Sequence, residues 1–221
     1  MSAPVSPSVG WGVLHLFCKP TDRLDREAVI AAVKAARDAD HQVVGASMLG
    51  HKCDVAFMAL GPDFRVLRAL QTALQAAGLD VVDSYVSLTE VSEYAAGMPA
   101  EMLKPRLAPQ LPPEGKSAFC FYPMSKRRGD GANWFTLPFD DRKELMHEHG
   151  TSGRKFAGRV VQVISGSTGL DDYEWGVTLF ALNPDDLKEV VYTMRFDKAS
   201  AVYAEFGTFY VGMVTEVDEL V

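Results

Sequence analysis

Apolar residues follow two alternating spacings along this chain, and the order of the spacings repeats. Short apolar runs typical of buried strands alternate with segments in which apolar residues recur every three or four positions, as on one face of a helix. The first half reads strand, helix, strand, strand, helix, strand, and the second half has the same order. The pattern therefore predicts an internal repeat.

The predicted elements of the first copy are strands at 10–18, 43–50, 53–60 and 79–94 and helices at 25–39 and 61–78. Those of the second copy are strands at 117–124, 160–169, 173–182 and 206–217 and helices at 140–158 and 183–205. Such a β-α-β-β-α-β unit forms a four-stranded antiparallel sheet with both helices on one face. The fold class is α+β, and two such sheets can pack into a barrel.

The repeat divides the chain into an N-terminal ferredoxin-like half at 1–95 and a C-terminal half at 117–221. Between them, residues 96–116 are rich in proline and are expected to form a long connecting loop. Long connections often carry functional residues, and this one contains Arg106.

Composition favours a soluble, cytoplasmic protein with a full core. The chain has 221 residues, of which 48% are hydrophobic. No run approaches the roughly 18 apolar residues that a membrane-spanning helix needs, and the N-terminus lacks the pattern of a signal peptide. Three cysteines, Cys18, Cys53 and Cys120, lie in apolar segments without paired spacing and are expected to be buried free thiols.

Charge is distributed unevenly. The net charge of -7 argues against nucleic acid as a partner. Between Lys104 and Arg159, however, eleven basic residues accompany six acidic ones. A basic segment in an acidic protein favours an anionic ligand, although a solvated face that balances an acidic neighbour is an open alternative.

The two copies differ where chemistry is expected. The second copy has Tyr122, followed by Lys126 and then Trp134, and its first helix contains a His-Glu-His-Gly sequence that includes His149. Nothing in the first copy matches that sequence. The candidate site therefore belongs to the C-terminal half.

Five segments resemble the chlorite-dismutase-like superfamily of haem proteins: FCFYPMSKRR, NWF, MHEHG, GRVVQVISGSTGLDDYEWGVTLFA and MRFDKASAVYAEFGTFYVG. The likeness runs through nearly all of residues 100–215 and is strongest to the coproheme decarboxylase branch. It implies a dimeric α+β barrel, a homopentamer, and peroxide-driven conversion of iron-coproporphyrin III (coproheme) to haem b. It also implies a transient contact with the ferrochelatase that supplies coproheme.

The same resemblance assigns three principal roles. His149 is expected to bind the iron, since a neutral imidazole is a good axial ligand. Tyr122 is expected to carry a radical that removes hydrogen from a propionate. Lys126 is expected to hold the carboxylate of the reacting propionate.

Further contacts follow from the resemblance. Arg106 and Ser200 match propionate contacts, although a surface ion pair and helix packing are their structural alternatives. Arg154 either supports the iron-side helix or binds a propionate. Met124 and Trp134 match pocket positions but also suit a core. Adjacent pocket positions are Pro123 and Ser125, and Gln162 matches the distal position.

Gln162 distinguishes among the functions of the superfamily. Members that convert chlorite carry an arginine at this position, and a neutral glutamine offers only weaker hydrogen bonds. A haem-binding or haem-transfer module without decarboxylase activity is the second hypothesis, and chlorite dismutase or peroxidase is the third. Phe135 and Ala108 replace tyrosines of many relatives, so alternative radical sites are missing.

Overall fold

The computed structural model describes residues 3–95 and 97–220, and its element order confirms the repeat. The first copy consists of β1 (Gly12–Pro20), α1 (Arg26–Asp38), β2 (Gln42–Met48), β3 (Val55–Gly61), α2 (Phe64–Ala76) and β4 (Leu79–Thr89). The second consists of β5 (Ala118–Lys126), α4 (Phe139–Arg154), β8 (Val160–Gly166), β9 (Trp175–Ala181), α5 (Pro184–Met194) and β11 (Tyr210–Val214).

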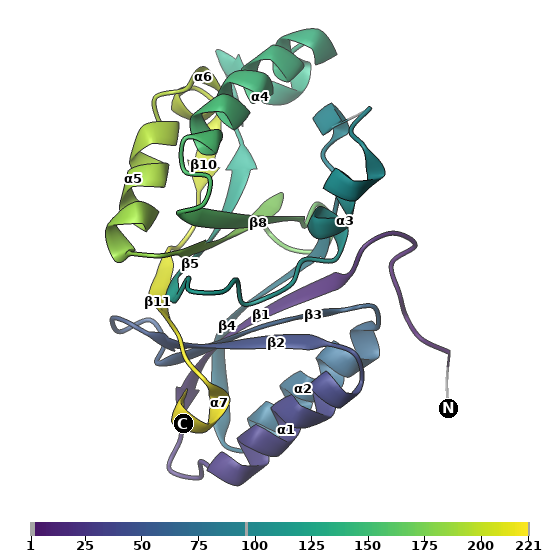
Figure 1. Ribbon diagram of the computed structural model, residues 1–221, viewed down its shortest axis with the longest axis vertical. Helices are drawn as coiled ribbons and strands as arrows, with labels where there is room; N and C mark the ends of the chain where they lie inside the picture. The colour runs from purple at the N-terminus through teal and green to yellow at the C-terminus, as the bar shows by residue number, and fades with distance from the viewer. Residues whose placement is uncertain (1–2, 96, 221) are drawn as a thin grey trace.

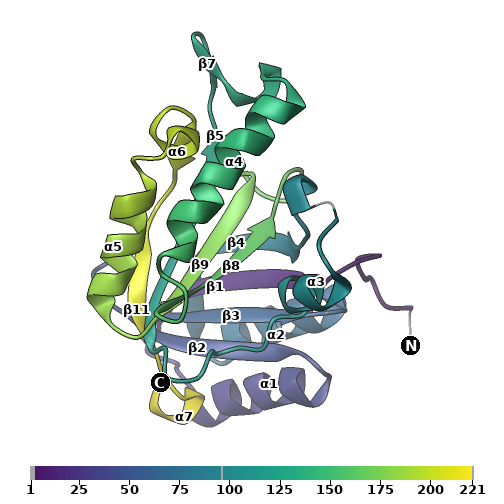
Figure 2. The same cartoon turned by 45° about the horizontal axis from the view of Figure 1, so that its top comes forward.

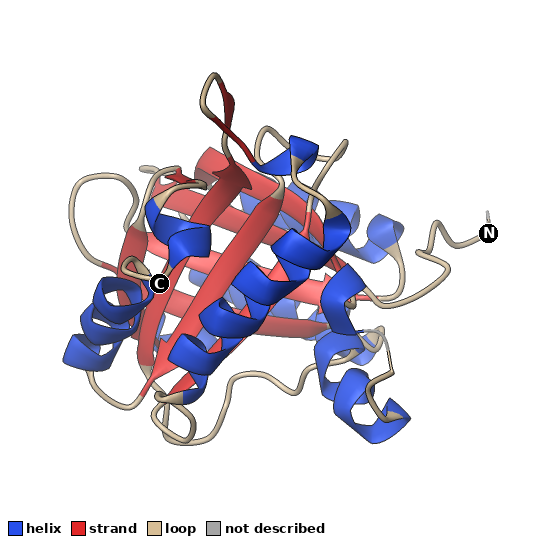
Figure 3. Cartoon of the chain, turned by 90° about the horizontal axis from the view of Figure 1, so that it is seen from above, coloured by secondary structure: helices blue, strands red, loops and turns tan. Residues whose placement is uncertain are grey.

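The strands of both copies form one closed barrel (Figure 1, Figure 3). Their order is β10-β5-β11-β2-β3-β1-β4-β8-β9, where β10 is Ala204–Phe206, and β5 also pairs with β9. Within each copy the order is that of a ferredoxin-like sheet, and the copies join where β2 pairs with β11 and β4 with β8. The predicted α+β barrel of two fused repeats is confirmed.

Three apolar clusters form the core. One lies between α1, α2 and the first sheet, and a second, which includes Phe17, Phe119 and Phe121, fills the barrel. The third lies between the second sheet and α5 and includes Tyr122, Phe156 and Leu187. Helices α1 and α2 therefore cover one end of the molecule and α4 and α5 the other (Figure 1, Figure 2).

The helices of the first copy begin where the sequence places an acidic cap. Asp25 and Asp63 each accept a backbone N–H in the first turn of α1 and α2. In α1, Val29, Ala32, Val33 and Ala36 form the buried stripe. Capping and periodicity thus account for these helices without reference to any site.

Helix α4 differs, because none of its sixteen residues is fully buried. A half-buried stripe runs along it at helical spacing and includes Leu145, Met146, His149 and Gly153. A helix without a buried face gains little from core packing. Other contacts must hold α4 in place.

The structure corrects three predicted elements. The helix expected over 183–205 ends at Met194 and is followed by the short helix α6 (Lys198–Ala201) and by β10. Asp197 begins α6, because its carboxylate accepts the N–H of Ser200. The strand expected over 79–94 ends at Thr89 and is followed by the turn η1 (Glu93–Ala95). The connecting loop expected over 96–116 contains helix α3 (Ala100–Leu107), so Arg106 lies on a helix.

Four short elements had no counterpart in the sequence pattern. They are the hairpin strands β6 (Arg128–Gly129) and β7 (Ala132–Asn133), the turn η2 (Trp134–Thr136) and the C-terminal helix α7 (Val217–Leu220). Among the described residues, no helix is both long and apolar enough to span a bilayer. The three cysteines are buried and free, as predicted.

Gly176 tests the packing of the barrel. A Cβ at this position of β9 would lie 2.9 Å from the Tyr85 ring and 3.2 Å from the Phe121 ring. Because overpacking a core typically costs about 1–3 kcal/mol, Gly176→Ala should lower the free energy of unfolding in urea by that amount. Gly129→Ala in β6 is the control, since nothing lies within 4 Å of its added Cβ. Equal urea midpoints for the two variants would contradict this packing.

Candidate active site

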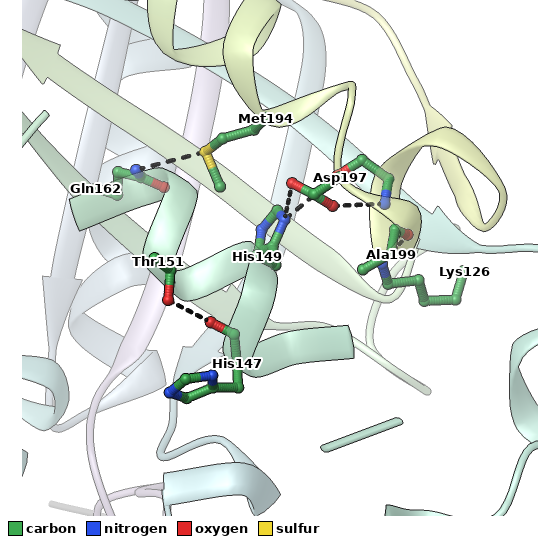
Figure 4. A network of polar contacts seen from close by, with 9 residues as sticks. Lys126, His147, His149, Thr151, Gln162, Met194, Asp197 and Ala199 are labelled. Atoms are coloured by element: carbon green, nitrogen blue, oxygen red, sulfur yellow. Dashed lines mark hydrogen bonds and ion pairs between the residues drawn. The ribbon is translucent and has the colours of Figure 1, made fainter. Parts of the chain in front are cut away.

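The predicted site residues converge on the segment between α5 and β10. Met194 contacts Gln162, Asp197 contacts His149, and the carbonyl of Ala199 contacts Lys126 (Figure 4). These three partners come from β8, α4 and β5, which are far apart in sequence. The segment from Met194 to Ser200, here called the junction segment, therefore brings the site together.

His149 is oriented by a buried carboxylate. Its Nδ1 lies 2.9 Å from Oδ2 of Asp197, whose side chain is 1% exposed, whereas the imidazole is 26% exposed. Burial lowers the pKa of His149 although Asp197 opposes this, so the ring is neutral at pH 7. The neutral ring donates Nδ1–H to Asp197, which leaves the Nε2 lone pair for a metal.

Ser200 belongs to the same hydrogen-bonded group. Its backbone N–H donates to Oδ1 of Asp197 at 2.9 Å, and its hydroxyl lies 3.3 Å from Nδ1 of His149. The resemblance predicted a propionate contact for Ser200. In the structure its contacts support the histidine.

Lys126 lies at the end of β5 and is 6% exposed. Its Nζ donates to the carbonyl of Ala199 at 2.7 Å and lies 4.6 Å from the ring centroid of Trp134. Burial lowers the pKa of Lys126 to about 8, while Asp197 and Glu174 act in the opposite direction. One backbone acceptor leaves two of the three ammonium protons for an anionic ligand.

Glu174 fixes the backbone beside Lys126. Its carboxylate accepts the Lys126 N–H at 2.9 Å and also pairs with Arg128 of the β6–β7 hairpin. The Glu174 N–H lies 3.2 Å from the hydroxyl of Ser125. Ser125 therefore has a structural contact, as has Pro123, whose carbonyl accepts the N–H of Gly207.

Tyr122, Met124 and Lys126 alternate along β5 and so lie on one face of the sheet, the face toward the helices. The Tyr122 ring stacks on Phe209 at 4.4 Å and meets Phe206 edge-on. Burial raises the pKa of Tyr122, so the phenol stays protonated. None of the described residues forms a hydrogen bond with its hydroxyl, which is therefore available to a ligand.

The same face of β8 carries Gln162 and Ile164. Gln162 is half-buried, with its Nε2 4.0 Å from Sδ of Met194, and it lies against Gly153 of α4. Ile164 is 43% exposed despite its place in the central sheet. The described protein atoms therefore bury neither this apolar part of the sheet nor the half-buried stripe of α4 completely.

Other predicted residues do not join this group. Arg106 on α3 is exposed, and no described residue pairs with it. Arg154 is exposed and donates to Thr151 within α4 at 2.6 Å, which fits support of the helix. Phe135 is 44% exposed and lies against Arg128, and Ala108 follows the end of α3.

Asp197 and Glu174 belong to the site but were not predicted from the sequence. The signal for Asp197 was present, since an aspartate three residues before Ser200 is typical of a helix N-cap. Unbroken helical periodicity over 183–205 concealed it. Glu174 had no local signal, because its partners lie almost fifty residues earlier in the sequence.

The donor set fits an iron porphyrin with carboxylate side chains. It comprises an imidazole with a free nitrogen, an ammonium with free protons, a phenol, a primary amide and incompletely covered apolar surface. The fold and the site together define a class: a fused-repeat α+β barrel with a histidine-centred site on the helix-covered face of its second sheet.

Comparison with known proteins identifies the family of that class. Residues 25–215 match the chlorite dismutase family. This match covers most of the chain, so the protein belongs to that family.

Three relatives show how closely the chain follows known members. A coproheme decarboxylase of Staphylococcus carnosus (strain TM300) is 39% identical over an aligned length of 249 residues. That alignment covers 100% of this chain and 98% of the relative. One of Staphylococcus saprophyticus is 44% identical and covers 79% of this chain and 73% of the relative. The solved structure of a heme-binding protein from Thermus thermophilus is 36% identical, with a TM-score of 0.87 and coverage of 100% and 98%.

The buried ammonium of Lys126 should make stability depend on pH. Its pKa is about 8 in the folded protein, whereas the ordinary pKa of a lysine is 10.5. Between these values the unfolded chain binds more protons, so the free energy of unfolding rises with pH, by about 3 kcal/mol in total. Urea unfolding at pH 7 to 10.5 should show this rise for the protein but not for Lys126→Met.

Lys143→Met is the control for that measurement, because Lys143 is an exposed lysine of α4. It should leave the pH dependence unchanged. If the curves of the protein and Lys126→Met run parallel above pH 8, the ammonium is not desolvated as described.

Proposed function

We propose that this protein converts iron-coproporphyrin III to haem b by oxidative decarboxylation of two propionates to vinyl groups, with hydrogen peroxide as oxidant. Two relatives of 39% and 44% identity bear the name coproheme decarboxylase. Each propionate consumes one peroxide and yields one vinyl group, one carbon dioxide and two waters. The reaction would complete haem synthesis from coproporphyrin.

The observation that carries this proposal is the surface between α4 and the second sheet. The stripe of α4 that holds His149 is only half-buried, and Ile164 on β8 is exposed. A flat, largely apolar ligand with a metal at its centre would cover both surfaces, and Nε2 of His149 would coordinate the metal. The iron porphyrin supplies the oxidising power when peroxide reacts with it.

Tyr122 would transfer that oxidising power to the substrate side chain. Loss of an electron and a proton turns the phenol into a phenoxyl radical, which takes a hydrogen atom from the propionate β-carbon. Tyr122 uses one of the two oxidising equivalents that one peroxide supplies. The substrate radical would give one more electron to the second equivalent, and the bond to the carboxylate would break to release carbon dioxide. The hydroxyl of Tyr122, which has no described partner and is mostly shielded from solvent, suits this step.

Lys126 would hold the propionate that reacts. Its ammonium is buried, and two of its protons have no described acceptor. A carboxylate there would satisfy those protons and raise the lowered pKa of the ammonium. Trp134, against which the ammonium lies, would leave the other sides of the ammonium for that carboxylate.

Gln162 bears on whether the site could also convert chlorite. Gln162 would be one of the residues that hold the porphyrin, and its amide lacks the positive charge expected for efficient chlorite conversion. We further propose a homopentamer in the cytoplasm that meets the ferrochelatase supplying coproheme; these assignments rest on the resemblance. Arg106 would bind a propionate from α3.

Tyr122→Phe should bind coproheme as the protein does and yield little haem b. Because only the phenol is lost, we expect turnover to fall at least about 100-fold, or roughly 2.7 kcal/mol in activation free energy. Product mass after peroxide titration measures it. Tyr203→Phe is the matched control, since Tyr203 is a neighbouring phenol that packs on Trp134, and it should keep turnover. Full turnover of Tyr122→Phe would refute the proposed radical step.

Asp197→Asn should weaken the hold on iron while α6 keeps its cap. The amide oxygen still accepts the Ser200 N–H, but the negative charge beside His149 is lost. Loss of the residue that accepts the other N–H of a metal-binding histidine typically costs about 10- to 100-fold in metal affinity or activity. Because a negative charge near the iron is removed, the reduction potential of bound ferric coproheme should also rise. Spectroscopic titration and potentiometry measure both. Unchanged affinity and potential would show that Asp197 does not act through His149.

A further inference from the structure

A second buried phenol, Tyr210, lies next to Tyr122 across two paired strands. Tyr210 on β11 pairs with Phe121 on β5, the residue that precedes Tyr122. Its sequence neighbour Phe209 stacks on Tyr122 at 4.4 Å. Tyr210 faces the barrel interior whereas Tyr122 faces the helices. Two adjacent strands thus carry the two phenols on opposite faces of the sheet.

The two phenols differ in what receives their proton. The hydroxyl of Tyr210 donates to the carboxylate of Asp83 on β4. Tyr122 has no such acceptor among the described residues. Burial raises the pKa of Tyr210, so it is protonated before oxidation and must release a proton when oxidised. A hydrogen-bonded carboxylate takes that proton without any movement of heavy atoms, which lowers the free energy of the Tyr210 radical relative to that of Tyr122.

Aromatic contacts fill the space around Tyr210. Its ring stacks on Phe17 with centroids 3.8 Å apart and planes at 14°, and Phe17 lies 5.4 Å from Phe121. Lys52 donates to the carbonyl of Phe209 and lies 5.6 Å from the Tyr210 ring. Since Lys52 and Asp83 are exposed, this end of the aromatic cluster reaches the surface.

We propose that the Tyr210–Asp83 pair is a second oxidation site, which removes an oxidising equivalent from Tyr122 when no reactive propionate is bound. This rests on the proposed radical at Tyr122. An electron moves from Tyr210 to the Tyr122 phenoxyl, the Tyr210 proton moves to Asp83, and Tyr122 regains a proton from solvent. A small soluble thiol or phenol then returns an electron to Tyr210, which takes its proton back from Asp83.

Another barrel phenol provides a matched control. Tyr85 is 3% exposed, lies 5.3 Å from Phe121 and is hydrogen-bonded, as Tyr210 is. Its partner, however, is the hydroxyl of Ser167, which is a poor proton acceptor compared with a carboxylate. Tyr85→Phe and Tyr210→Phe thus remove similar aromatic hydroxyls, only one of which has an acceptor for the released proton.

The experiment adds peroxide to the complex with haem b, which has already lost the two reactive propionates. Freeze-quench electron paramagnetic resonance follows the phenoxyl signal, a spin trap with peptide mass spectrometry locates it, and absorption follows porphyrin bleaching. We expect a trapped radical at Tyr210 in the protein and in Tyr85→Phe. Tyr210→Phe and Asp83→Asn should lose that adduct and bleach several-fold faster, while their decarboxylation of coproheme stays unchanged.

The possible failures are distinguishable. If Tyr210→Phe and Asp83→Asn match the protein in radical yield and bleaching while Tyr122→Phe still lacks turnover, the second oxidation site is wrong and the proposed function stands. If Tyr122→Phe keeps full turnover, the proposed radical step is wrong. A Tyr210 adduct that persists in Tyr122→Phe would overturn the transfer from Tyr122, because the porphyrin would then oxidise Tyr210 directly.

Discussion

The buried carboxylate of Asp197 is the constraint on which the site depends. Its side chain is 1% exposed, and a carboxylate removed from water is costly unless charged or N–H donors surround it. Its two oxygens accept from His149 and from the backbone of Ser200. These donors lie on α4 and α6. Satisfying one charge therefore fixes the position of α4, the tautomer of its histidine and the start of α6.

A second buried acid does the same for the lysine side of the site. Glu174 accepts the backbone N–H of Lys126 and pairs with Arg128. These two contacts join β5 to the hairpin that precedes Trp134. The basic segment of the sequence is therefore only partly available to a ligand. Arg128, Arg142 and Arg159 pair with acidic residues, as the alternative of a balanced face predicts. Lys126 has no such side-chain partner among the described residues and fits the anionic-ligand interpretation.

The sequence was sufficient for the repeat, the barrel and the place of the principal residues, because periodicity and capping are local properties. It was insufficient for the junction segment. Apolar spacing continues through 183–205, so the local pattern favours one helix, whereas the break at Asp197 depends on a histidine almost fifty residues away. The same limit explains why Glu174 was not predicted. Side-chain partners between distant elements leave no periodic signal.

Comparison of the two copies explains why the site lies in the second. Helix α1 buries a stripe that includes Val29 and Val33, and α2 buries Leu67, Leu70 and Leu74. Helix α4 occupies the place of α1 but has no fully buried residue, so its inner face contributes less to stability. That face is free to bind a ligand only because polar contacts at the junction segment hold the helix. A ligand that covered it would supply the missing apolar contact and stabilise the folded state in proportion to its binding.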